Sequence, residues 1–401
     1  MENLSNEVNN KAFQPIKEEY PDHCKIVQLT DEELYYFAKN EEDKRKIDKV
    51  VENYPVRITS YLRKMMKHSE ALKKQYLPSP EEYGDNGTPT PFEEGKESAK
   101  TYGLERVYRD RVLIAPNFEC PAYCRYCYKK SRVLRGKRGM SYNEIIEATQ
   151  EVSKMKEVRG VVITGGEPLL DLKKLFFLLD GLSYLDNISE IRVGTRTLLN
   201  SPHIFTDELA NKFAAYIRPN FENAENSKYL AFNVHFNHPD ELTPEVLRAC
   251  HKLTSRGITL RNQTVLLKGI NDDVKTIKKL FSLLLRNNII VYYLNHCMPA
   301  EGAGHFRTTV QKGIDIYRYL CTESSTLIPH YVYAPSGGKV HVGSDTKLTY
   351  KVVDGTEYIE TVMPYSVDEF KKITKKALPA LHQETPEGFM VGMYINGNKN
   401  S

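Results

Sequence analysis

The sequence lacks a long hydrophobic run, since no stretch of about 18 or more apolar residues occurs among its 401 residues. Its N-terminus, MENLSNEVNN, also lacks the basic region followed by an apolar one that marks a secretory signal. These absences argue against a membrane-spanning or secreted protein. We therefore expect a cytoplasmic location.

An excess of charge of one sign is missing as well. Lys and Arg number 56 against 52 Asp and Glu, which gives a formal net charge of +4. This balance does not indicate nucleic acid or an anionic membrane as a partner. Charge alone identifies no ligand.

The chain is long enough for a large α/β barrel with an additional domain, and its 40% of hydrophobic residues can fill a sizeable core. A helical pattern covers residues 30–77 and opens on Thr30 as a candidate cap. Residues 77–98 are rich in Pro, Gly, Asp and Thr, which indicates an irregular connection. We predict a helical N-terminal domain and linker (1–100), a barrel (101–345) and a C-terminal extension (346–401).

Strand and helix patterns alternate from about residue 110. Six short apolar runs, from RVLIAP to NIIVYYLNHC, are separated by segments with helical spacing such as SYNEIIEATQEVSKM and DVKTIKKLFSLLLRN. This alternation predicts a parallel sheet that curls into a partial (β/α)6 barrel, with its chemistry at the carboxyl ends of the strands.

Cysteine is scarce, and its distribution is informative. Of seven cysteines, four are scattered and three lie within eight positions directly after the first predicted strand: Cys120, Cys124 and Cys127. The odd count does not suit a secreted disulfide framework. Three thiolates can hold an iron-sulfur cluster with one open position, or a zinc ion completed by a distant residue such as His296, or they are buried thiols. The spacing leaves these alternatives open.

A resemblance narrows the choice. The pattern Cys-x3-Cys-x2-Cys, with Tyr126 before the last cysteine, resembles the signature of the radical S-adenosylmethionine (radical SAM) enzymes. The resemblance implies that the three cysteines hold a 4Fe-4S cluster whose open iron binds SAM, which is cleaved to a 5'-deoxyadenosyl radical. TGGEPLL after the second strand is similar to the family's motif that contacts the SAM amino group, here Gly165, Gly166 and Glu167.

Further motifs resemble the lysine 2,3-aminomutase family, which combines radical SAM chemistry with pyridoxal 5'-phosphate (PLP). They run in the family's order from about residue 55 to about 345, and include VGTRT, NVHFNHPDELT, NQTVLLKGIND and APSGGK. The resemblance places the Schiff-base lysine at Lys339, and desolvation there would lower its pKa as imine formation requires. Three motif residues are further candidates for cofactor contact: Arg196, His235 and Gln263.

The phosphate of PLP needs cations, and here the chain departs from the family. Tyr108 and Arg111 match the tyrosine and the second arginine of the family's phosphate element, whereas Val107 replaces the first arginine. Arg106 or Arg109 is the expected substitute.

Other departures concern the substrate. Lysine-acting members have two aspartates that neutralise the substrate's side-chain amine, and here Met298 and Tyr333 stand at those places. Burying an unpaired ammonium ion costs several kcal/mol, so free lysine is not the expected substrate. Lys129 replaces the family's arginine fork for the substrate carboxylate. Two further candidates for substrate contact lie at the end of the sixth strand: Asn295 and His296.

The resemblance implies an amino acid 2,3-aminomutase that moves the α-amino group of a non-lysine amino acid to the β-carbon, with an external flavodoxin- or ferredoxin-type electron donor and a homo-oligomeric state. No cysteine follows Cys321, so the family's C-terminal zinc group has no counterpart. Three alternatives remain: another rearrangement or a decarboxylation, modification of a protein-bound lysine, and a non-catalytic metal-binding module.

Overall fold

The computed structural model describes residues 25–85, 87–91, 101–133, 138–323, 326–335, 338–343, 346–379 and 381–397. Cys24, the rest of residues 1–24 and residues 92–100 of the predicted linker lie outside the described residues. Within them, no helix combines the length and the apolar character that a bilayer crossing requires.

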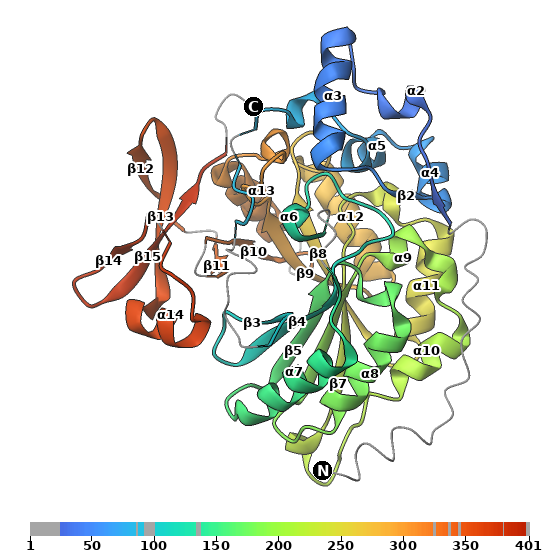
Figure 1. Ribbon diagram of the computed structural model, residues 1–401, viewed down its shortest axis with the longest axis vertical. Helices are drawn as coiled ribbons and strands as arrows, with labels where there is room; N and C mark the ends of the chain where they lie inside the picture. The colour runs from blue at the N-terminus through green and yellow to red at the C-terminus, as the bar shows by residue number, and fades with distance from the viewer. Residues whose placement is uncertain are drawn as a thin grey trace.

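A nine-stranded sheet, which curves around the centre of the molecule, forms the body of the fold (Figure 1). The six predicted strands are confirmed and pair in parallel with their sequence neighbours. They are β4 (Arg111–Asn117), β5 (Gly160–Gly165), β6 (Glu190–Thr195), β7 (Tyr229–Val234), β8 (Thr259–Leu266) and β9 (Ile290–His296).

A seventh parallel strand, which the sequence pattern did not indicate, continues the sheet as β10 (His330–Tyr333). Antiparallel strands close the two edges: β3 (Leu104–Arg106) beside β4, and β11 (Val340–His341) beside β10. In the part of the chain that the structure describes, β3 and β11 do not pair with each other. The barrel is therefore partial, as predicted.

Helices cover the outer face of the sheet (Figure 1). Their starts follow from local capping: Ser141 and Glu144 form a capping box at one helix, and Asp273 caps another. The helices of this layer are α7 (Tyr142–Lys154), α8 (Leu172–Ser183), α9 (Thr197–Asn200), α10 (Asp207–Ala214), α11 (Pro244–Thr254), α12 (Val274–Arg286) and α13 (Val310–Glu323). The short helix α6 (Lys130–Val133) instead follows the cysteine loop. Short 3-10 helices are η3 (Pro168–Leu170), η4 (Pro202–Ile204), η5 (Ala224–Asn226), η6 (Pro239–Glu241) and η7 (Gly304–Phe306).

The segment before the barrel is mainly helical. Thr30 caps its first helix with a capping box, as predicted, but this helix is only four residues long and a second cap, Asn40, starts the next. The elements are β1 (Ile26–Val27), α2 (Asp31–Leu34), α3 (Glu41–Asn53), β2 (Ile58–Thr59), α4 (Ser60–Met66), α5 (Glu70–Tyr76) and η2 (Pro80–Glu82). Most of its buried apolar side chains between Ile58 and Leu77 belong to the same buried cluster as those of the barrel.

After the barrel, the chain forms a four-stranded antiparallel sheet with one helix. The elements are β12 (Thr349–Val353), β13 (Thr356–Ser366), α14 (Val367–Thr374), β14 (Gln383–Glu384) and β15 (Phe389–Ile395). The Tyr394 hydroxyl donates a hydrogen bond to the Cys297 carbonyl, at 3.0 Å. The extension is thus joined to the barrel at the carboxyl end of β9.

Candidate active site

The cysteine loop follows β4 and opens onto a cavity of about 330 Å³ that Cys120, Cys124 and Cys127 line together. Backbone hydrogen bonds tie the loop to the N-terminal segment, since Tyr123 N donates to the Arg57 carbonyl and Arg125 N to the Gln75 carbonyl. The loop position is therefore set from both sides.

The two lysines after the cysteines have different surroundings. Lys129 lines the cavity, and its Nζ lies 3.5 Å from Thr164 Oγ1. Lys130 is turned away and buried, where its Nζ lies 3.3 Å from Glu82 Oε2. Arg125 donates to both oxygens of the same carboxylate. Burial raises the pKa of Glu82, but Arg125 and Lys130 more than offset this and hold it below its usual value.

The three thiols line one cavity, and thiolates are the usual ligands of iron-sulfur clusters, in which the cysteines bind different iron atoms. Among the described residues, no group of three or more His, Cys, Asp or Glu side chains is arranged to hold a metal ion. Burial raises the pKa of the Cys127 thiol to about 11, so metal binding must displace its proton.

The GGE motif lies at the end of β5, beside the cysteine loop. Gly165 adopts a φ of +120°, and a Cβ on Gly166 would overlap the backbone of Glu119. The glycines are thus required by the close approach of the chain's own β4 loop. Glu167 is buried and accepts hydrogen bonds from Thr195 Oγ1 at 2.7 Å and Arg196 N at 2.8 Å.

Arg196 and His235 also line this cavity. One guanidinium nitrogen of Arg196 donates to Cys124 Sγ at 2.8 Å, and the other donates to Gln75 and Glu241. Burial and the charge of Arg196 lower the pKa of His235 to about 3, so its imidazole is neutral. Arg196 therefore places its positive charge next to a thiol of the cysteine loop.

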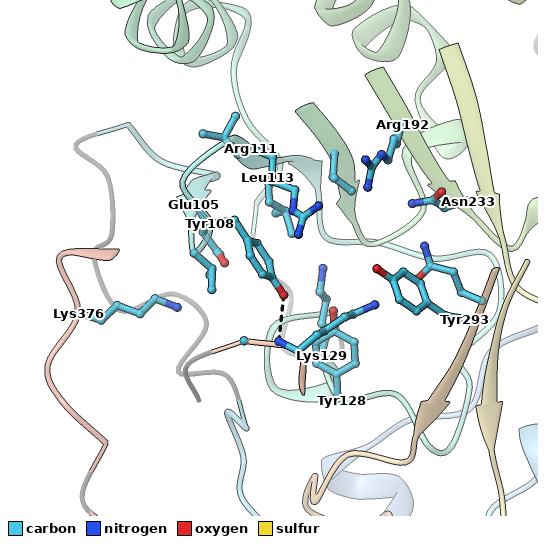
Figure 2. Close-up of a pocket in the computed structure, with 16 residues that line it drawn as sticks. Glu105, Tyr108, Arg111, Leu113, Tyr128, Lys129, Arg192, Asn233, Tyr293 and Lys376 are labelled. Atoms are coloured by element: carbon cyan, nitrogen blue, oxygen red, sulfur yellow. Dashed lines mark hydrogen bonds between the residues drawn. The ribbon is translucent and has the colours of Figure 1, made fainter. Parts of the chain in front are cut away.

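A second cavity, of about 200 Å³, adjoins the first and contains Lys339 (Figure 2). The two share several lining residues, including Lys129, Asn233, Gln263 and Lys339. The Lys339 Nζ lies 3.6 Å from the ring centroid of Tyr293. Burial, followed by the charges of Arg111 and Arg192, lowers the pKa of Lys339 to about 7. A large part of this amine is therefore neutral at neutral pH.

The predicted phosphate residues separate into two groups. Tyr108 and Arg111 line the second cavity, and the Tyr108 hydroxyl accepts a hydrogen bond from Lys339 N at 3.1 Å. Arg106 instead binds the Tyr108 and Arg109 carbonyls and Glu157, and Arg109 pairs with Glu369. Neither is among the described residues lining this cavity, so the structure does not bring either suggested substitute to it.

Two basic residues that the sequence reasoning missed line the second cavity: Arg192 and Lys376. Arg192 lies on β6, four residues before the VGTRT arginine, and Lys376 follows α14 in the extension. The alternation of buried and half-buried residues along β6 could have shown that Arg192 and Gly194 share a face.

The candidates for substrate contact are also divided. Asn295 and Met298 line the first cavity. His296 borders it, but its ring nitrogens lie 3.0 Å from the Tyr331 hydroxyl and 3.1 Å from the Thr308 carbonyl, so both have partners in the protein. Tyr333 is not among the described residues lining either cavity, and its hydroxyl is bonded to Thr361 of the extension. Its sequence neighbours Val332 and Ala334 line the first cavity instead.

Asn233 is a further residue that the sequence reasoning did not single out. It lies on β7 where the two cavities meet and is only 8% exposed. Its side-chain Oδ1 has no hydrogen-bond partner. Because a buried acceptor without a donor is costly, this atom indicates a place for a ligand's hydrogen-bond donor.

Comparisons with known proteins agree with this geometry. A family model described as the radical SAM superfamily matches residues 114–281. The chain is 40% identical over 247 residues to a "Putative L-lysine 2,3-aminomutase" of Aquifex aeolicus, covering 61% of this chain and 64% of that protein. It is 33% identical to the L-lysine 2,3-aminomutase of Methanococcus maripaludis, covering 75% and 68%. It is 35% identical to the glutamate 2,3-aminomutase of Clostridioides difficile, covering 64% and 58%. The aligned part is less than two thirds of the Aquifex and Clostridioides proteins.

Proposed function

Because the chain belongs to the lysine 2,3-aminomutase family of radical SAM enzymes, we propose that it is a PLP-dependent 2,3-aminomutase of an amino acid other than lysine. One observation carries this proposal. Lys339, with its lowered pKa, enters the same cavity that the three cysteines line. An amine suited to imine formation and a candidate metal-cluster site thus share one chamber.

The radical SAM family implies SAM and a 4Fe-4S cluster, and the described residues fit both. The three thiols suit a cluster, and backbone groups and Glu167 of the GGE motif border the same cavity. When bound, the cluster and SAM supply a carbon radical that removes a hydrogen atom from the substrate. Residues of β4, β5, β6 and the cysteine loop line the cavity in which this reaction would take place.

PLP fits the second cavity by three features. Lys339 supplies an amine with a lowered pKa, Tyr108 and Arg111 border the same space, and Asn233 offers an unpartnered acceptor. When bound, PLP supplies an aldehyde that condenses with amines and a ring that delocalises an unpaired electron. Lys339, which lines both cavities, would hold PLP as an imine, and Lys129, which also lines both, would bind the substrate carboxylate.

The lining of the cavity supports a substrate with a neutral or apolar side chain. In the described part of the chain, the carboxylates that line the two cavities are Glu105 and Glu167, and each already has partners. Asn295 pairs across the sheet with Val265 and Val332, which with Met298 form a mostly apolar wall. A buried ammonium group at this wall would have no carboxylate to pair with.

The test uses anaerobically reconstituted protein with SAM, PLP and dithionite, and screens the proteinogenic amino acids singly by mass spectrometry. We expect 5'-deoxyadenosine together with a β-amino isomer of one neutral or apolar amino acid. Lys339→Ala should abolish isomer formation, whereas Lys347→Ala, at an exposed position, should retain it.

Two results would contradict the proposal. If lysine is the amino acid that isomerises, the assignment of substrate class is wrong. If 5'-deoxyadenosine accumulates while every amino acid is returned unchanged, the aminomutase reaction itself is wrong.

A further inference from the structure

The cavity around Lys339 is rich in positive charge. Five basic side chains line it among the described residues, against one carboxylate, Glu105. That carboxylate is ion-paired with Arg132 from α6. The basic residues are Arg111, Lys129, Arg192, Lys339 and Lys376. An enclosed space with this lining favours an anion.

Arg192 has a fixed position in this lining. It is bonded to Glu190, and the other oxygen of the same carboxylate accepts from Arg261 Nη1 at 2.8 Å. One carboxylate therefore serves two arginines, and this cluster keeps a net positive charge. Of the two arginines in this cluster, Arg192 lines the cavity, whereas Arg261 is not among the described lining residues.

The family's first phosphate arginine is replaced by Val107, an apolar residue that lines the same cavity. The aldehyde and the phosphate-bearing group of PLP are attached to neighbouring ring carbons. Cations that hold the phosphate must therefore lie near the Lys339 amine. Arg111 and Arg192 meet this condition, because the charges of both depress the pKa of that amine.

Lys376 is the other basic residue of this cavity that could bind the phosphate. In Figure 2, the Tyr108 ring stands between Lys376 and the side of the cavity where Arg111 and Arg192 extend. The two arginines come from β4 and β6, on either side of β5, and they line the same cavity as Lys339.

Resting on the PLP dependence proposed above, we propose that Arg192 on β6 is the second phosphate-binding cation of this protein, acting with Arg111 in place of the arginine that Val107 replaces. Its planar guanidinium carries several N–H donors in a fixed fork, so it can donate to phosphate oxygens while Nη2 stays paired with Glu190.

The test compares PLP with pyridoxal, which has the same aldehyde but no phosphate. Apparent dissociation constants are measured from the visible absorbance of the lysine imine, and borohydride reduction with peptide mass spectrometry shows that Lys339 carries the adduct. For Arg192→Met we expect the PLP constant to rise at least about tenfold, with the pyridoxal constant nearly unchanged. Arg192→Lys, which keeps the charge but not the fork, should be intermediate.

Arg261→Met is the matched control, because it disrupts the same Glu190 cluster without changing a described lining residue; it should leave both constants nearly unchanged. Equal losses for PLP and pyridoxal in Arg192→Met would overturn the proposal and assign Arg192 a structural role. A selective loss of PLP in Lys376→Met but not in Arg192→Met would also overturn it. A wild-type protein that forms no imine with either aldehyde would instead refute the PLP dependence.

Discussion

At the scale of single residues, Lys339 shows how the surroundings prepare a side chain for chemistry. An exposed lysine is almost fully protonated at neutral pH, whereas burial and two nearby guanidinium groups bring the pKa of Lys339 to about 7. Because only the neutral amine attacks an aldehyde, the rate of borohydride-trapped adduct formation should rise between about pH 6 and about pH 8 and then level off.

A variant that removes one of the nearby charges tests the cause of the lowered pKa of Lys339. Arg111→Met removes a nearby positive charge, which should raise the pKa of Lys339 and move the midpoint of the pH profile upward. Pyridoxal is used here, so that loss of a phosphate contact does not enter the result. A rate that still rises through pH 10 in the wild-type protein would show that Lys339 is not desolvated as the structure indicates.

How far the site was predictable also differs from residue to residue. The cysteines, the GGE motif and Lys339 lie in short motifs, so local sequence was enough to select them, and their roles remain predictions. Tyr333 also lies at a motif position, but strand alternation turns it toward Thr361, and Val332 and Ala334 line the cavity instead. Side-chain direction depends on strand register, which a motif does not specify.

At the scale of elements, a buried ion cluster joins η2 to the cysteine loop. Glu82 of η2 accepts hydrogen bonds from Arg125, between the cysteines, and from Lys130 at the start of α6. Glu82→Gln would leave two buried cations without a counter-charge, so we expect a loss of about 3–5 kcal/mol in the free energy of unfolding. Urea titration measures this change.

Glu81→Gln is the matched control, because this neighbour is exposed and its side chain should contribute little. The cluster also predicts a functional consequence: Glu82→Gln should bind less iron on reconstitution, because the cysteine loop loses an anchor. Unchanged stability together with unchanged iron content would show that Arg125 and Lys130 find other partners.

The elements themselves were more predictable than their contacts. Each of the six predicted strands is a run of apolar residues bounded by helical segments, and all six occur. β10 was missed because its four residues, HYVY, precede a glycine-rich loop that dominates the local pattern. The predicted irregular segment 77–98 includes Glu82, whose buried pairing depends on residues more than 40 positions away. Such long-range partners leave no local signal.

At the scale of the whole molecule, the N-terminal helices are part of the barrel's core. Leu62, Leu72 and Tyr76 are buried in one cluster with residues of β4, β6 and α9. Hydrogen bonds also join the N-terminal segment to the barrel. The Tyr76 hydroxyl donates to Asn200 Oδ1 at 3.0 Å, and Thr59 Oγ1 donates to the Asn200 carbonyl at 2.6 Å. We therefore expect both parts to unfold as one cooperative unit.

Leu72→Ala tests this expectation, because Leu72 is fully buried and its truncation should cost about 2–5 kcal/mol. Hydrogen exchange with mass spectrometry, followed across a urea series, reports on residues 60–77 and 190–200 separately. If the core is shared, the substitution should lower the midpoints of both segments by the same amount, whereas Lys64→Ala, at an exposed position of α4, should change neither. A lowered midpoint confined to residues 60–77 would mean that the N-terminal helices unfold independently. The barrel would then position its cysteine loop without them, contrary to the contacts of Glu82, Gln75 and Arg57.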